Sequence, residues 1–179
     1  MITENVKHGV DFIFTKAAKA NLVATAGDSI EVTALPSGKL VETPEKNIVV
    51  LTVSSYLFRL LTIFHINRDK GTEAYFTKGD ASVDFFEAFS ELGNMCCGAM
   101  NRDLGNYFPH LGMSTPYVLD SKCLPFLKEL KPNYVSQHNI VINGSINLHG
   151  TLCMCSYAPI DFRVDMSIAE EATGALEMF

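Results

Sequence analysis

Hydrophobic and polar residues recur with two different periods along this chain, and the two periods predict different elements. A helical pattern over residues 4–25 ends before Gly27. A second, longer helix is predicted from about Ser82 to Tyr107, because Pro109 cannot continue it. These two segments are expected to be the main helices of the fold.

Segments that favour strands lie between and after the two helices. They are residues 28–40, which end in a Pro-Ser-Gly turn, 47–67 (two strands), 115–120, 137–155 and 160–168. Residues 68–80 predict one short helix, and residues 121–132 a helical turn or an irregular link. This arrangement indicates an α+β fold, with an antiparallel or mixed sheet packed against the long central helix and the N-terminal helix. We expect a single domain over residues 1–179.

Asn143-Gly144 is the strongest hairpin signal in the chain. A two-residue turn at this dipeptide pairs Ile142 with Ser145, and counting outward places His138 opposite His149. Two facing imidazoles could bind a metal, but the neighbouring residues do not complete a closed set of ligands. A polar sheet face or a dimer contact is the preferred interpretation.

Composition excludes two classes of function. The net charge is -6 and no run of Lys or Arg exceeds a pair, so the chain lacks the basic surface expected of a nucleic-acid-binding protein. The most apolar run, residues 49–64, contains serines and Arg59, and it is therefore not expected to span a membrane. The 47% hydrophobic content is enough to fill a sizeable core.

The expected compartment is the cytoplasm. Glu4 and Asp11 lie where a signal peptide would have a basic region and an unbroken apolar core. The five cysteines are then expected to be reduced thiols, and the pairs Cys96-Cys97 and Cys153/Cys155 to be buried as small hydrophobic side chains.

The long helix carries an unusual outward stripe. At about 100° per residue, Glu87, Glu91, Asn94 and Gly98 fall within about 60° of one another. Five apolar residues fall on the opposite side and are expected to face the core: Phe85, Phe89, Leu92, Cys96 and Met100. Gly93, Asn94 and Gly98 are poor helix formers in the middle of this helix, which suggests that their presence serves a purpose.

The residues of this stripe can position a water molecule, but none of them is a nucleophile. An asparagine amide has an acceptor and two donors, so Asn94 can orient a water molecule without changing its protonation state. Glu91 lies one turn earlier and can pair with a lysine of a partner, and Gly98 lets another surface approach closely. The simpler alternative is a solvated helix face with ordinary polar residues.

The segment ELGNMCCG resembles the active-site helix of the CheC/CheX/FliY family of chemotaxis phosphatases. That family has Asp or Ser, three residues, Glu, two residues, Asn, twenty-one residues and then Pro. Glu91, Asn94 and Pro116 match this spacing, whereas Glu87 occupies the Asp/Ser position. The first helix has no second copy of the motif, so the chain resembles CheX more than CheC.

The resemblance implies a CheC-like fold and a phosphatase that acts on the aspartyl phosphate of a CheY-type receiver domain. Asn94 would hold the attacking water, Glu91 would pair with the receiver's active-site lysine, and Pro116 would be architectural. Glu87 and Gly98 would lie in the docking surface. The chain would need no cofactor of its own, because the required Mg²⁺ would belong to the receiver. A homodimer paired through strand edges is also implied.

Two alternatives remain open at this point. The first is a non-catalytic receiver-binding adaptor or oligomerising module with a CheC-like fold. The second is a small-molecule or metal-binding α+β domain centred on His138 and His149.

Overall fold

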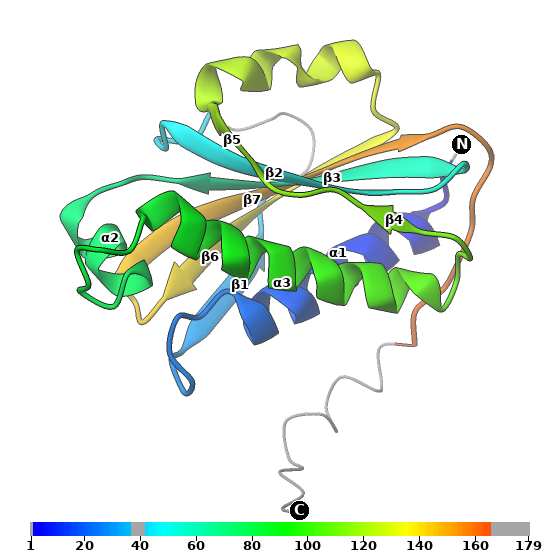
Figure 1. The fold of residues 1–179 in the computed structure, drawn as a ribbon. Coiled ribbons are helices and arrows are strands. Elements are labelled where there is room, and N and C mark those ends of the chain that lie inside the picture. Colours follow the sequence, from blue (N-terminus) through cyan, green and yellow to red (C-terminus); the bar gives the residue numbers. More distant parts are fainter. Residues whose placement is uncertain (1, 37–41, 166–179) are drawn as a thin grey trace, which may run out of the picture.

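A computed structural model describes residues 2–36 and 42–165 of the chain. Its helices are α1 (Glu4–Asn21), α2 (Lys70–Phe76), α3 (Phe85–Gly105) and the 3-10 helix η1 (Ser121–Leu130). Its strands are β1 (Ile30–Ala34), β2 (Asn47–Ser54), β3 (Phe58–Ile66), β4 (Gly112–Met113), β5 (Tyr117–Asp120), β6 (Tyr134–Ile142) and β7 (Ile146–Ser156). The predicted α+β class is confirmed, and Figure 1 shows the two long helices on one side of the sheet and η1 on the other.

The described strands form one sheet of seven strands in the order β1-β6-β7-β3-β2-β4, and β5 also pairs with β2. Every pairing between these strands is antiparallel, so of the two predicted types the sheet is antiparallel and not mixed. The short edge strands β4 and β5 follow α3 in sequence and return the chain along β2. The end of the site helix is therefore connected directly to the sheet edge beside it.

The main core lies between the sheet and the helices α1 and α3. Apolar residues of α3 recur every three or four positions and are buried at Phe85, Phe89, Cys96 and Met100, as the helical pattern predicted. Leu92 is partly buried against the same core. The opposite, outward stripe is left uncovered by the described residues of the chain.

The second face of the sheet carries a smaller apolar cluster under η1. Leu127 of η1 packs with Ile48 and Val50 of β2 and with Ile63 of β3. Polar residues occupy much of the remainder of this face, including the buried side chains of His65 and Thr151. The two faces of the sheet therefore differ in character: one is an apolar core and the other is mixed.

The hairpin is present, but its predicted register is wrong by one residue. Asn143 and Gly144 both have positive φ, as the turn requires. The strand register nevertheless pairs Ile142 with Ile146, so the loop contains one more residue than a two-residue turn. His138 consequently lies opposite Gly150, whose missing side chain leaves room for the Phe14 ring of α1.

Other boundaries differ for tertiary reasons. The first helix ends at Asn21 rather than near residue 25, because the Ala24 N–H donates to the Tyr75 hydroxyl instead of to a helical carbonyl. The long helix begins at Phe85, since the Asp84 carboxylate accepts the Glu87 N–H and caps it.

The predicted last strand is absent from residues 160–165. Only Ile160 forms an isolated bridge, to Ile2, and Phe162 packs beside Gly9 of α1. Residues 166–168 of that predicted strand lie outside the described residues, as do Ser37 and Gly38 of the predicted turn.

Candidate functional site

The outward stripe of α3 is accessible at the residues that the motif identified. Glu87 and Glu91 are exposed, and Asn94 and Gly98 are partly buried. Within the described part of the chain, neither the Glu91 side chain nor the Asn94 side chain makes a hydrogen bond or an ion pair. A carboxylate and an amide one helical turn apart are thus both available to a partner molecule.

The two glycines of the helix have different structural roles. Gly93 lies where α3 crosses the sheet, and a Cβ there would be 3.4 Å from Leu51 Cδ1 and 3.5 Å from Phe64 Cδ2. Gly98 faces open space, and its nearest neighbour would be Arg102 Nη1 at 3.7 Å. Packing within the chain therefore accounts for a small residue at position 93 but not at position 98.

This difference predicts opposite effects of substitution on stability. Gly98→Ala should raise the free energy of unfolding by about 0.5–1 kcal/mol, because alanine favours the helix and its methyl group meets only the flexible Arg102 side chain, at an ordinary contact distance. Gly93→Leu should lower it by about 1–3 kcal/mol through overpacking against Leu51 and Phe64. Urea unfolding of both variants measures the two effects, and a stability loss in Gly98→Ala would show that the glycine is needed for the fold itself.

Pro116 lies at an interruption of the sheet edge. Val53 of β2 pairs with Met113, whereas Val50 pairs with Tyr117, so three residues of the edge face two residues of β2. The Ser114 hydroxyl accepts the Thr52 N–H at 3.0 Å and takes the place of a backbone acceptor in the ladder. A proline has no N–H to donate, and this irregular position is one that it can occupy without losing a ladder bond.

The interruption brings the motif together in space. Leu51 is one of the two β2 residues that face the irregular edge, and it is also the nearest neighbour of Gly93. The turn of α3 that carries Asn94 therefore lies over the part of the sheet next to Pro116. Asn94 and Pro116, with twenty-one residues between them in sequence, thus belong to one region of the surface.

Uncharged and apolar side chains adjoin the stripe. Met95 is 53% exposed on α3, and Met113 is 39% exposed on the neighbouring strand β4. Because Met113 pairs with Val53, a core residue, it lies on the same face of the sheet as α3. Exposed methionines adapt to the shape of a partner and are frequent in binding surfaces.

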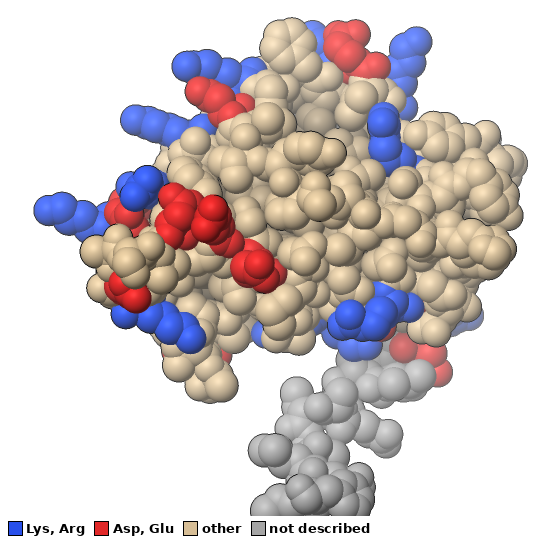
Figure 2. Space-filling model, in the orientation of Figure 1, with Lys and Arg blue, Asp and Glu red and all other residues tan. Residues whose placement is uncertain are grey.

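The charge on this face changes along α3. Figure 2 shows acidic side chains over the first half of the helix, an uncharged region over its middle, and cationic side chains near its last turns. Glu87 and Glu91 belong to the acidic half, whereas Arg102 is exposed in the last turn. Asn101 and Arg102 lie beyond the four residues of the predicted stripe, although the same helical rotation, continued past Gly98, includes both.

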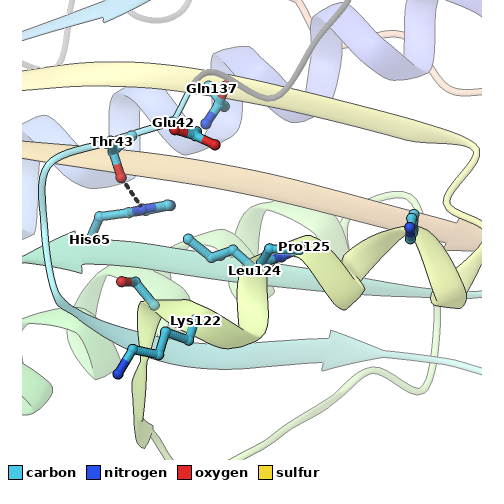
Figure 3. A pocket seen from close by; sticks show the side chains of 9 residues that line it. Glu42, Thr43, His65, Lys122, Leu124, Pro125 and Gln137 are labelled. Carbon is cyan, nitrogen blue, oxygen red and sulfur yellow. Dashed lines mark hydrogen bonds between the residues drawn. The ribbon is translucent and has the colours of Figure 1, made fainter.

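A separate cavity of about 480 Å³ lies on the other face of the sheet, between residues 42–43 and η1. Figure 3 shows the His65 ring and Leu124 side by side in it, with the Thr43 hydroxyl directed at the ring. Both nitrogens of His65 are occupied, Nδ1 by the Thr43 hydroxyl and Nε2 by the Thr151 hydroxyl, each at 2.8 Å. This cavity is on the opposite face from Glu91 and Asn94, and its histidine is used in structural hydrogen bonds.

Burial lowers the pKa of His65 from 6.5 to about 4; the nearby carboxylate of Glu45 opposes this shift and His149 adds to it. The unfolded chain therefore binds a proton between pH 6.5 and pH 4 that the folded chain does not bind. Stability should fall as the pH falls through this window, by about 3 kcal/mol in total from His65.

Urea unfolding between pH 4 and pH 8 measures this dependence. In a plot of the free energy of unfolding against pH, His65→Gln should remove a large part of the slope below pH 6.5. Above pH 7 the curves of the variant and the wild type should be parallel. An unchanged slope would show that His65 titrates normally in the folded protein. Burial also lowers the pKa of His138, so some slope is expected to remain.

The predicted pair of facing histidines, His138 and His149, is not formed. His138 packs against Phe14 on the helix face, with 4.8 Å between ring centroids, whereas His149 pairs with His65 on the opposite face. His149 Nδ1 lies 2.8 Å from Glu45 Oε1. Among residues 2–36 and 42–165, no three His, Cys, Asp or Glu side chains are grouped as metal ligands.

Four of the five cysteines are buried, as expected of the two pairs, and Cys123 is partly buried. Cys96, Cys97, Cys153 and Cys155 are buried, and none of the five cysteines forms a disulfide. Burial raises the pKa of Cys97 to about 12, so its thiolate is scarcely populated at neutral pH. No helix among the described residues has the length and apolar character needed to cross a bilayer.

Comparison with known proteins relates this fold to chemotaxis proteins. No protein-family model matches the chain, and no curated protein matches it in sequence. CheX from Vibrio vulnificus aligns with 86% of this chain and 100% of its own, with a TM-score of 0.56 and 13% identity. CheX from Borrelia burgdorferi, solved in a complex with CheY, BeF3 and Mg²⁺, aligns with 83% of this chain and 96% of its own, with a TM-score of 0.55 and 8% identity.

A putative chemotaxis protein from Desulfovibrio vulgaris Hildenborough aligns with 86% of this chain and 97% of its own, with a TM-score of 0.54 and 12% identity. The three proteins match over nearly their whole length, so the similarity concerns the complete arrangement of helices and strands. The chain therefore has the fold of the CheC-like and CheX chemotaxis proteins.

Proposed function

We propose that this protein hydrolyses the aspartyl phosphate of a CheY-type receiver domain. The observation that carries the proposal is the pair Glu91 and Asn94, displayed without intramolecular partners on a helix of a CheX-like fold. A protein with this fold has been solved in a complex with CheY, which supports a receiver domain as the partner.

The proposed reaction needs positioning more than covalent chemistry. Water attacks phosphorus, the bond from phosphorus to the aspartyl oxygen breaks, and free aspartate and inorganic phosphate result. The Asn94 carbonyl can accept a hydrogen bond from that water, while its N–H group can donate to a phosphoryl oxygen. A Mg²⁺ ion in the receiver would neutralise the charge that develops on the phosphoryl group.

Glu91 is proposed to set the orientation of docking. An ion pair with the receiver's active-site lysine would place Asn94, one turn further along α3, over the phosphorus atom. Glu87 and Gly98 would extend this contact, the former by adding negative charge and the latter by leaving space. Met95 and Met113 would provide apolar contact beside it.

A homodimer paired through strand edges is part of the same proposal. Of the described residues, none pairs with the outer edge of β1, whereas the opposite edge is interrupted near Pro116. An uninterrupted edge strand can extend its hydrogen-bond ladder onto a second copy. Pairing through β1 would leave the stripe of α3 free on both copies.

The central experiment measures phosphate loss from a phosphorylated receiver in Mg²⁺, with and without the protein. We expect the protein to accelerate the loss above the receiver's own rate. Binding of the receiver without acceleration would instead favour the adaptor function. Absence of both binding and acceleration across the receivers of the same genome would contradict the proposal altogether.

A further inference from the structure

The outward stripe of α3 continues beyond Gly98. Asn101 follows Asn94 by seven residues, which is about 20° short of two full turns, and it lies about 10 Å further along the helix axis. Gly98 lies between them, and the space around it is open except for the Arg102 guanidinium, 3.7 Å from the position of a Cβ. Asn94, Gly98 and Asn101 therefore lie in one row along the helix surface, with no side chain at its centre.

The amide of Asn101 has an unsatisfied oxygen. Its Oδ1 atom is buried and has no hydrogen-bond partner in the part of the chain that the structure describes. A buried carbonyl oxygen without a donor is unfavourable and uncommon. The residue as a whole is only partly buried, and its amide carries two N–H donors in addition to this oxygen.

Arg102 adds a cation at the same end of the stripe. It is exposed and forms no ion pair among the described residues, and its guanidinium lies toward Gly98 rather than away from the stripe. Glu91 lies at the other end, about 16 Å away along the axis. Acceptors at one end and donors at the other give this surface a polarity, which Figure 2 shows as acidic and cationic regions separated by uncharged surface.

We propose that Asn101 and Arg102 form a second docking contact, which binds a carboxylate on the surface of the receiver domain. The proposal rests on the function proposed above and adds to it a feature required of the partner. The receiver must present a cation toward Glu91 and an acid toward Arg102, so only one docking direction satisfies both ends. Asn101 and Arg102 are positioning residues, and they do not contact the phosphoryl group.

The test measures binding of a receiver loaded with beryllofluoride and Mg²⁺, which stands in for the phosphorylated form. Arg102→Glu should weaken binding about tenfold or more at low salt, equivalent to about 1.4 kcal/mol, and by less as salt is added. Asn101→Ala should weaken it about threefold to tenfold. In the phosphatase assay both changes should raise KM and leave kcat unchanged.

Two matched variants serve as controls. Lys19→Glu changes the net charge equally on α1, and Asn106→Ala removes an exposed amide just beyond the end of α3. Both should bind the receiver like the wild type. Arg102 is exposed, so Arg102→Glu tests the contact even if Asn101→Ala affects folding, which circular dichroism would detect.

The possible results separate this inference from the proposed function. If the wild type binds the receiver, and Arg102→Glu binds it with the same affinity as Lys19→Glu, the second contact is overturned and the phosphatase proposal stays intact. A wild-type protein that binds no receiver contradicts the phosphatase proposal and this inference together. A fall in kcat rather than a rise in KM would also overturn the inference, because it would place these residues in the chemical step.

Discussion

Asn94→Ala is expected to lower kcat for receiver dephosphorylation by about a hundredfold to a thousandfold. Loss of one preorganised hydrogen-bonding group that acts on the reacting atoms has effects of this size. KM should change little, because Glu91 and the rest of the docking surface remain. Single-turnover decay of a phosphorylated receiver at saturating protein measures the chemical step directly.

The same variant should fold normally. The Asn94 side chain makes no hydrogen bond within the described part of the chain, and alanine is a better helix former than asparagine. Its free energy of unfolding should therefore equal or slightly exceed that of the wild type. Equal dephosphorylation rates for the variant and the wild type would contradict the role of Asn94 and favour an adaptor.

Glu91→Lys is expected to lower kcat/KM by about a hundredfold, chiefly through KM. The change replaces the proposed ion pair with a repulsion between two cations, and losses of roughly 2–5 kcal/mol are typical when one charge of a docked pair is removed. Titration of receiver binding and initial rates at several receiver concentrations separate the two kinetic parameters.

Glu129→Lys is the matched control for this prediction. Glu129 is exposed on η1, so the variant has the same net charge as Glu91→Lys but carries the change on a different element. It should retain wild-type kcat/KM. If both variants lose activity equally, the effect of Glu91 is one of overall charge and not of docking.

The local features of the site could be predicted from sequence because they depend on a single helix. The spacing of Glu87, Glu91, Asn94 and Gly98 determines that they share one face, whatever the rest of the chain does. The apolar residues on the opposite side determine that this face points outward. Fold class followed in the same way from the alternation of strands with two long helices.

The environment of each residue could not be predicted in this way. Gly93 and Gly98 look alike in sequence, and only the packing of α3 on β2 and β3 shows that the first is close to Leu51 while the second faces open space. The separation of His138 from His149 likewise depends on one extra residue in a hairpin loop, because a shift of one residue moves a side chain to the other face of a sheet.

The sequence alone determined the two long helices and the outward display of a carboxylate and an amide on one of them, since helical periodicity is a local property of the chain. Only the tertiary structure decided that Pro116 lies beside that helix, that His65 rather than His138 neighbours His149, and that residues 160–165 form no strand. These results depend on strand order, register and the fit of side chains between layers. Such contacts join residues that are distant in sequence, and no local pattern specifies them.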